Sequence, residues 1–258
     1  MSEKIDRQRE HFNSISDKYW TARKGANHLL IKHLIWQHFF ADKKRLLAPG
    51  KKLLEPMCGM AEGLSIVQEF VQRDVNYFGF DYSENMVTIA RGQHPGMRIE
   101  WRDATTFDPK DERFDFIILI GGLHHVFEQS ADVVAKLSRA LNPGGYFLTF
   151  EPTQNTWITR KVREHIYRRN ELFDEQTEQG FDLQDLDAMF GAAGMRLVDQ
   201  AYPGLLAYVL YYNPDAFPLL NRGGEAAVRM TFAMDRIFWK GWLGRKLSFA
   251  TISLWIKA

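Results

Sequence analysis

The sequence predicts an α/β protein whose core is a doubly wound, mostly parallel sheet of seven strands, with N-terminal helices and a helical cap. Three observations predict this fold class. Short apolar runs alternate with stretches of helical spacing from residue 51 onward, as in parallel strands joined by helices. Turn-forming residues separate these runs, such as the Asn-Pro-Gly-Gly turn at 142–145. The length of 258 residues allows one such domain with a sizeable cap.

The elements follow in order. Asn27 is expected to cap a helix whose apolar residues recur at helical spacing, and Pro49 with Gly50 ends the helical region. Five apolar runs are expected as strands, at 51–56, 75–81, 97–103, 114–122 and 145–152. Helices at 64–72, 83–92 and 131–141 connect them. Asp182 is then expected to cap a helix through Phe190, before a strand near Arg196 and a last strand at 248–257.

Composition excludes several classes of protein. The single cysteine, Cys58, rules out an internal disulfide framework and a cysteine-rich zinc site, and no metal site is expected. A net charge of +1 gives no electrostatic reason to expect nucleic acid as a partner. The charged start differs from a signal peptide, and no apolar stretch approaches the roughly 20 residues of a membrane-spanning helix. We therefore expect a cytoplasmic protein.

Four motifs suggest a nucleoside-binding cleft at the carboxyl ends of the strands. The first strand runs into a turn of small residues, with Gly59, Ala61 and Gly63, where a ligand can approach the backbone. Asp81 ends the second strand and can accept hydrogen bonds from both hydroxyls of a ribose. Asp103 follows the third strand, where its carboxylate can accept the exocyclic amine of an adenine. The fourth strand leads into the segment LHHV at the mouth of the same cleft.

These motifs resemble the class I S-adenosylmethionine-dependent methyltransferases over about residues 50–200. Glu55, Cys58 and Gly59 stand in the family's first motif, and LNPGGYFLTFEP matches the segment that leads into its fifth strand. The resemblance implies S-adenosylmethionine as cofactor. It implies a cofactor-binding set of Glu55, Met57, Cys58, Gly59, Ala61, Asp81, Tyr82, Met86, Arg102, Asp103, Ala104 and Gly121. Met57 and Ala61 depart from the family, which usually has glycine at both places.

The resemblance also implies a domain organisation and a reaction. Residues 1–49 are expected to form a helical lid, 50–200 the S-adenosylmethionine-binding core, 153–181 a cap insertion, and 201–258 a hydrophobic and basic helical insertion with the last strand. The reaction is the in-line transfer of a methyl group to a nucleophile on a small molecule. His124 and His125 are candidate bases, although a histidine here can also cap the loop or pack over the cofactor. Tyr19, Arg23, His165 and Tyr167 are candidate substrate-binding residues.

Two segments bear on the substrate. Residues 160–169 carry five Arg or Lys against one Glu and could hold a phosphate, or could form a solvated helix. Residues 205–247 are long, aromatic and basic, with Arg222, Arg229 and Arg236 at intervals of seven. An amphipathic helix of this kind can lie at an anionic membrane surface, cover a hydrophobic substrate, form a homodimer or pack on the sheet. Peripheral contact at the inner membrane surface is thus one alternative.

The favoured function is O-methylation of a sugar-containing, lipid-linked or other amphipathic small molecule. Methylation of carbon or nitrogen on a soluble metabolite and a non-catalytic, membrane-associated scaffold of the same fold remain alternatives. A nicotinamide-dependent dehydrogenase is disfavoured because GxGxxG and a Tyr-x-x-x-Lys pair are absent. Nucleic-acid and protein methyltransferases are disfavoured by the charge and by Gly-Gly-Leu-His in place of an Asn-Pro-Pro-Tyr type loop.

Overall fold

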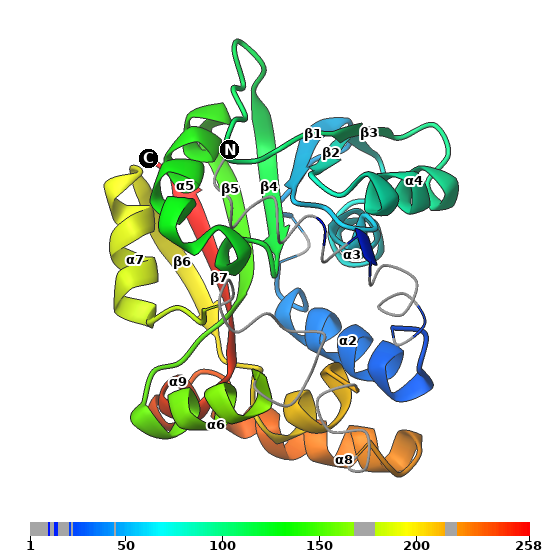
Figure 1. The fold of residues 1–258 in the computed structure, drawn as a ribbon, viewed down its shortest axis with the longest axis vertical. Coiled ribbons are helices and arrows are strands. Elements are labelled where there is room, and N and C mark those ends of the chain that lie inside the picture. Colours follow the sequence, from blue (N-terminus) through cyan, green and yellow to red (C-terminus); the bar gives the residue numbers. More distant parts are fainter. Residues whose placement is uncertain are drawn as a thin grey trace.

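A computed structural model describes residues 10, 13–14, 21, 23–43, 45–167, 179–214 and 221–258, with the side chains of 165–167 excepted. In this part of the chain, one seven-stranded sheet has the order β3-β2-β1-β4-β5-β7-β6 (Figure 1). The strands are β1 (Lys51–Pro56), β2 (Val75–Asp81), β3 (Arg98–Trp101), β4 (Phe114–Ile120), β5 (Leu141–Pro152), β6 (Met195–Ala201) and β7 (Ala250–Lys257). The first five strands pair in parallel, and β7 lies antiparallel between β5 and β6. The predicted fold class is confirmed.

Helices cover both faces of the sheet. The helices α2 (Ala26–Phe39), α3 (Glu62–Phe70) and α4 (Glu84–Gln93) contribute to one apolar core, and α5 (Ser130–Ala140) and α7 (Leu183–Ala192) to the other. Trp36 is fully buried in the first core and Phe190 in the second. The chain leaves β1 toward β2 on one side and later returns to β4 on the other. A ligand crevice is expected at the carboxyl end of this switch point.

The observed ends of the helices and strands confirm one predicted cap and correct three other predictions. The predicted cap at Asp182 is confirmed, because its side chain accepts the amide of Gln184. The predicted cap at Asn27 is wrong: α2 begins at Ala26, and the Asn27 side chain donates to Asn221 and Gly223 instead. The turn at 142–145 does not precede the fifth strand but bulges from it, since Leu141 already pairs with Phe114. The last strand begins at 250 rather than 248.

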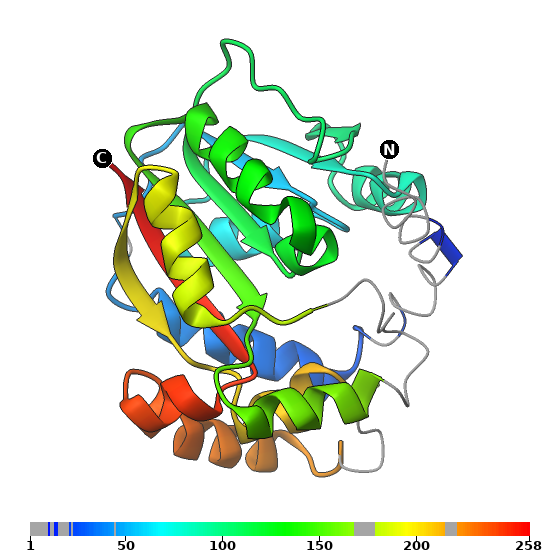
Figure 2. The ribbon, with the colours of Figure 1, turned by 60° about the vertical axis from the view of Figure 1, so that its left-hand side comes forward.

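Five short helices between residues 157 and 247 lie at one end of the molecule, among the described residues. They are α6 (Trp157–Tyr167), η2 (Tyr208–Tyr212), α8 (Glu225–Asp235), η3 (Arg236–Phe238) and α9 (Trp242–Leu247). Both ribbon views place α6, α8 and α9 together beyond the carboxyl ends of β4 and β5 (Figures 1 and 2). The three arginines spaced seven apart do not lie on one helix, because Arg222 precedes α8, Arg229 lies within it and Arg236 follows it. None of the described helices is long and apolar enough to cross a membrane.

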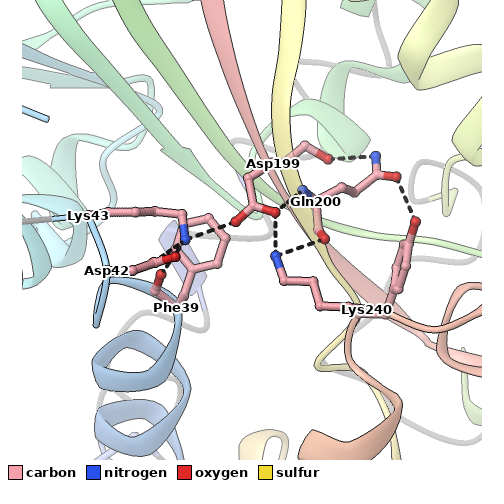
Figure 3. Close-up of polar contacts among 8 residues, drawn as sticks. Phe39, Asp42, Lys43, Asp199, Gln200 and Lys240 are labelled. Atoms are coloured by element: carbon pink, nitrogen blue, oxygen red, sulfur yellow. Dashed lines mark hydrogen bonds and ion pairs between the residues drawn. The ribbon is translucent and has the colours of Figure 1, made fainter.

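An ion-pair cluster ties this helical end to the sheet (Figure 3). Asp199 on β6 accepts the Lys43 ammonium at 2.9 Å and also pairs with Lys240, between η3 and α9. Lys43 also contacts Asp42 at 2.6 Å and the carbonyl of Phe39 at 2.9 Å, just beyond α2. Lysines from both sides hold the pKa of Asp199 below its usual value even though burial opposes this. The cluster joins α2, β6 and the segment before α9.

Candidate active site

The loop after β1 follows a left-handed backbone path at three alternate residues. The φ angles are 54° at Met57, 50° at Gly59 and 60° at Ala61. Side chains at such angles store strain of about 1 to 2 kcal/mol per residue. The path persists because the amide of Cys58 donates to the carbonyl of Phe80, and Ala61 donates to Cys58. The departures at 57 and 61 therefore keep the backbone conformation that glycine would adopt with less strain.

Glu55, at the end of β1, stabilises this loop through hydrogen bonds. Its Oε1 accepts the Gly63 amide at 2.6 Å, and Oε2 accepts the Leu64 amide at 2.9 Å and the Tyr77 hydroxyl at 2.7 Å. Burial raises the pKa of Glu55 to about 8, although all three hydrogen bonds oppose this shift. A Cβ at position 63 would lie 2.7 Å from Glu55 Cδ, so only glycine fits there. Glu55 thus fixes the start of α3.

Asp81 ends β2 beside this loop. Its Oδ2 accepts the Gly59 amide at 2.8 Å, and Oδ1 accepts the Ser83 amide at 2.9 Å. Burial raises the pKa of Asp81 to about 6, against the two amides. Each carboxylate oxygen can accept two hydrogen bonds, so each keeps one lone pair for a ligand hydroxyl. The next residue, Tyr82, lies between Asp81 and the α4 cap, where Ser83 accepts the amide of the buried Met86.

Asp103 lies on the neighbouring loop, after β3. The amide of Arg102 donates to the carbonyl of Asp81 at 2.8 Å, which joins the two loops. Asp103 Oδ1 accepts the amide and hydroxyl of Thr105 at 2.8 and 2.9 Å, whereas Oδ2 is buried with no hydrogen-bond partner. A buried carboxylate oxygen without a donor is costly unless a ligand supplies one. The buried Ala104 follows directly.

The loop after β4 lies next to the loop after β1. Gly121 has φ 61° and donates its amide to Phe150 on β5. A Cβ at Gly122 would lie 3.0 Å from Met57 Cβ and 3.1 Å from its sulfur. Met57 therefore bridges the loops after β1 and β4. The short helix η1 (Leu123–Gln129) then begins with the two candidate bases.

The two histidines have different surroundings. His124 is buried, and its Nδ1 lies 3.0 Å from Oε2 of Glu151, at the end of β5. The other oxygen of Glu151 accepts the amides of Gly122 and Leu123 at 2.9 and 3.0 Å. Burial lowers the pKa of His124 to about 3 and raises that of Glu151 to about 8. His125 is half-buried, and its ring lies 3.9 Å from that of His124, centre to centre.

Glu151 and Tyr77 were missed in the sequence analysis, and Glu151 is the more important of the two for the site. A carboxylate that binds one ring nitrogen of a histidine fixes the ring's orientation and tautomer, and it stabilises the imidazolium. The sequence does hold a clue to Glu151: it is an acid near the end of an apolar run, as Glu55 and Asp81 are in the first and second runs. Tyr77 was missed for another reason: its contact with Glu55 depends on the register between β1 and β2.

Of the four predicted substrate-binding residues, only Arg23 has a side chain among the described residues. Arg23 donates to the carbonyl of Tyr212 at 2.7 Å, which joins the N-terminal segment to η2. Tyr19 lies outside the described residues, as do the side chains of His165 and Tyr167. Asn13 does reach the cofactor side, where its Oδ1 accepts the hydroxyl of Ser83 at 2.6 Å. No group of three or more His, Cys, Asp or Glu in the described chain is arranged to hold a metal.

Comparison with known proteins gives consistent results. A family model described as a methyltransferase domain matches residues 53–145. A demethylmenaquinone methyltransferase from Bacillus mycoides is 26% identical over 239 residues, which span 83% of this chain and 98% of that protein. One from Lysinibacillus sphaericus is 24% identical, over 78% of this chain and 93% of that protein. A probable S-adenosylmethionine-dependent methyltransferase from Mycolicibacterium smegmatis is 27% identical, over 60% of this chain and 61% of its own.

Solved structures share the fold at low sequence identity. The magnesium protoporphyrin IX methyltransferase from Synechocystis, with bound S-adenosylhomocysteine, has a TM-score of 0.61 at 14% identity and covers 97% of this chain and 98% of its own. A cyclopropane synthase from Mycobacterium tuberculosis has a TM-score of 0.60 at 18% identity, over 87% of this chain and 83% of its own. Together with the ordered motifs, the matched methyltransferase domain and these relatives support a class I methyltransferase whose cofactor is S-adenosylmethionine, and the solved structures support its fold.

Proposed function

We propose that the enzyme methylates an oxygen of a small amphipathic acceptor, such as a lipid-linked or sugar-containing metabolite, and that His124 takes the acceptor's proton. The observation that carries this proposal is the buried pair of His124 and Glu151 after β4 and β5. A hydroxyl needs a proton acceptor as it attacks, and a histidine held by a carboxylate is suited to that role. His125, which is half-buried and adjacent, is the second candidate.

The described residues fit the cofactor. Asp81 keeps one lone pair on each oxygen for a ribose hydroxyl, and the partnerless Oδ2 of Asp103 would accept the exocyclic amine of adenine. The left-handed loop at Met57, Gly59 and Ala61 would line the methionine portion. When bound, S-adenosylmethionine supplies a methyl group on a positively charged sulfur. The protein's part is to orient the acceptor, exclude water and hold the proton.

The proton balance follows from the pair. For His124 Nε2 to accept a proton, Nδ1 must carry its hydrogen toward an ionised Glu151, so that the pair is negative overall. Burial opposes that charge and raises the pKa of Glu151 to about 8, whereas the amides of Gly122 and Leu123 favour the carboxylate. When the acceptor oxygen forms its bond to the methyl carbon, its proton passes to Nε2. The pair then becomes neutral overall, as burial favours.

Methylation of carbon is the second candidate. Its support is the name of relatives that cover most of this chain, demethylmenaquinone methyltransferase, which points to a small-molecule quinone. Nitrogen methylation of a soluble metabolite has no comparable support among the described residues. A lidding role for the N-terminal segment is supported by the contact of Asn13 with Ser83.

The test has two stages. Calorimetric titration with S-adenosylmethionine, S-adenosylhomocysteine and NAD should show saturable binding of the two adenosyl ligands and no signal for NAD. The protein is then incubated with isotope-labelled S-adenosylmethionine and a panel of phenolic lipids, lipid-linked sugars and demethylated quinones, and the methylated atom is located by NMR. An oxygen-linked methyl group supports the proposal. A carbon-linked methyl group overturns it in favour of the second candidate, and adenosyl binding without turnover on any acceptor favours the scaffold.

Substitutions of His124 and His125 test which of the two histidines is the base. We expect His124→Gln to lower turnover about 10²- to 10⁴-fold, the range of general-base catalysis, with cofactor affinity within about threefold of wild type. His125→Gln is the matched neighbour and should change turnover by less than about tenfold. The opposite ranking would move the base to His125.

A further inference from the structure

The helices α6, η3 and α9 carry an unusually apolar exposed surface, which we call the α6–α9 face. Its most exposed members are Trp157 at 75%, Ile237 at 75% and Trp242 at 72% of their full surface. Ile158, Phe238 and Leu243 are also exposed. Both ribbon views bring α6 and α9 side by side, and the Asn155 side chain, just before α6, donates to the carbonyl of Arg245 on α9 (Figures 1 and 2). The members thus belong to one end of the molecule.

These side chains are not the packing face of their helices. Between Glu225 and Leu247, the chain buries Phe232 on α8 and Trp239 just after η3, and their ring centres lie 6.1 and 5.1 Å from that of His38 on α2. The segment therefore has one apolar face that packs on the domain and a second that faces solvent. Soluble monomers rarely expose contiguous apolar surface without a binding partner. The expectation that residues 205–247 simply pack on the sheet accounts for Trp239 but not for Trp242.

The charge on this face selects the kind of partner. Residues 236–247 hold four basic side chains and no acid. Lys240 is neutralised by Asp199, but Arg236, Arg245 and Lys246 are exposed, and Arg160 on α6 is exposed as well. Exposed indole rings and exposed basic side chains on neighbouring short helices match the boundary of a bilayer, where indoles sit at headgroup level and cations meet anionic headgroups.

We propose that the α6–α9 face docks the enzyme on the surface of a membrane that contains anionic lipids. Trp157, Ile237 and Trp242 enter the headgroup region, and Arg236, Arg245 and Lys246 contact anionic headgroups. α6 begins five residues after Pro152, which ends β5 next to Glu151, so docking brings the acceptor side of the site toward the lipid. An acceptor with a lipid tail could then enter without leaving the membrane. The docking itself does not depend on methyl transfer.

The test is co-sedimentation of the full chain with vesicles of phosphatidylcholine alone or with about a third phosphatidylglycerol, without cofactor or acceptor. We expect binding to the anionic vesicles that weakens in salt. The double variant Trp157→Ala/Trp242→Ala and the double variant Arg245→Glu/Lys246→Glu should each lower the partition coefficient at least about tenfold. The matched controls are Trp101→Ala, an exposed tryptophan on β3, and Arg139→Glu at the end of α5, before β5 begins.

The outcomes discriminate. Loss in the face variants and not in the controls, with unchanged circular dichroism, supports the proposal. No binding to anionic vesicles overturns it, as does an equal loss in the controls. Light scattering is measured in parallel: a dimer that Trp157→Ala/Trp242→Ala converts to a monomer, without vesicle binding, would make this face a contact between two copies. Since neither readout uses S-adenosylmethionine, a failure of the proposed reaction is told apart from a failure of docking.

Discussion

The carboxyl ends of three strands and the α6–α9 face use their side chains in opposite ways. The ends of β1, β2 and β5 each carry a buried acid whose oxygens accept hydrogen bonds from within the chain: Glu55, Asp81 and Glu151. The α6–α9 face instead leaves its largest apolar side chains in solvent. The cofactor side is therefore organised by internal contacts. The helical end exposes apolar side chains among the described residues, so changes there should alter docking more than folding.

The three acids also differ from one another. Glu55 accepts three donors that hold the loop, so little of its capacity remains for a ligand. Asp81 accepts one amide on each oxygen and keeps one lone pair on each. Glu151 gives one oxygen to two amides and the other to His124. Acids at similar positions thus have different hydrogen-bond partners, which suit Glu55 to hold a loop and which favour the proposed roles of Asp81 with a ligand and Glu151 with a base.

Among the three acids, the largest effect should come from Glu151, which in our proposal acts as a positioning residue through His124. We expect Glu151→Gln to lower turnover about 10²- to 10³-fold, because an amide cannot stabilise the imidazolium. The rate of the wild type should rise with pH up to about 8, because burial raises the pKa of Glu151 and the pair must lose a proton to become a base. The variant should lose this rise, as measured in a pH profile at saturating cofactor.

The control for this prediction is Glu128→Gln, an exposed acid in η1. It should leave both the rate and the pH profile unchanged. A Glu151→Gln enzyme that keeps the rise in rate toward pH 8 would show that another group accepts the proton. An enzyme that only loses stability, with normal turnover per folded molecule, would reduce Glu151 to a structural acid like Glu55.

The next largest effect concerns cofactor affinity at Asp81. We expect Asp81→Ala to weaken binding of S-adenosylhomocysteine about 30- to 100-fold, because two hydrogen bonds to a charged group are lost. Asp74→Ala is matched to it, since Asp74 precedes β2 and Asp81 ends the same strand. Asp74 is exposed, and calorimetry should show unchanged affinity. An affinity within about threefold of wild type for Asp81→Ala would contradict the assignment of Asp81 to the ribose.

The regular parts of the sheet could be predicted from the sequence because their signals are local. The apolar runs at 51–56 and 75–81 coincide with β1 and β2, since a buried parallel strand requires a short continuous apolar segment. Asp182 caps α7 through its own side chain. The cap at Asn27 was mispredicted because a tertiary contact with Asn221 competes for its side chain. Such a contact leaves no trace in the local sequence.

The candidate site likewise combines residues with a local sequence signal and residues that only tertiary contacts bring together. Asp81 and Asp103 could be proposed as cofactor-binding residues because each stands at the carboxyl end of one strand, β2 or β3, where its own carboxylate would meet a ligand. The partnership of Glu151 with His124 could not, because it joins residues 27 positions apart across two strands. The exposure of Trp242 beside the buried Trp239 was equally out of reach, since it depends on the break between η3 and α9. Local pattern thus predicts strand ends and caps, whereas pairings across the fold require the structure.

The smallest effect should come from backbone strain at Ala61 in the loop after β1. It is best measured as the difference between two variants in their free energy of unfolding. Ala61→Gly and Ala90→Gly each remove one fully buried methyl group and add the same freedom to the unfolded chain. Only Ala61 has a left-handed φ, whereas Ala90 lies inside α4. We therefore expect Ala90→Gly to lose about 1 to 2 kcal/mol more free energy of unfolding than Ala61→Gly, as measured by urea denaturation. Equal losses would mean that the hydrogen bonds of Cys58 and Ala61 hold an unstrained loop, and that the alanine in place of the family's glycine costs no stability.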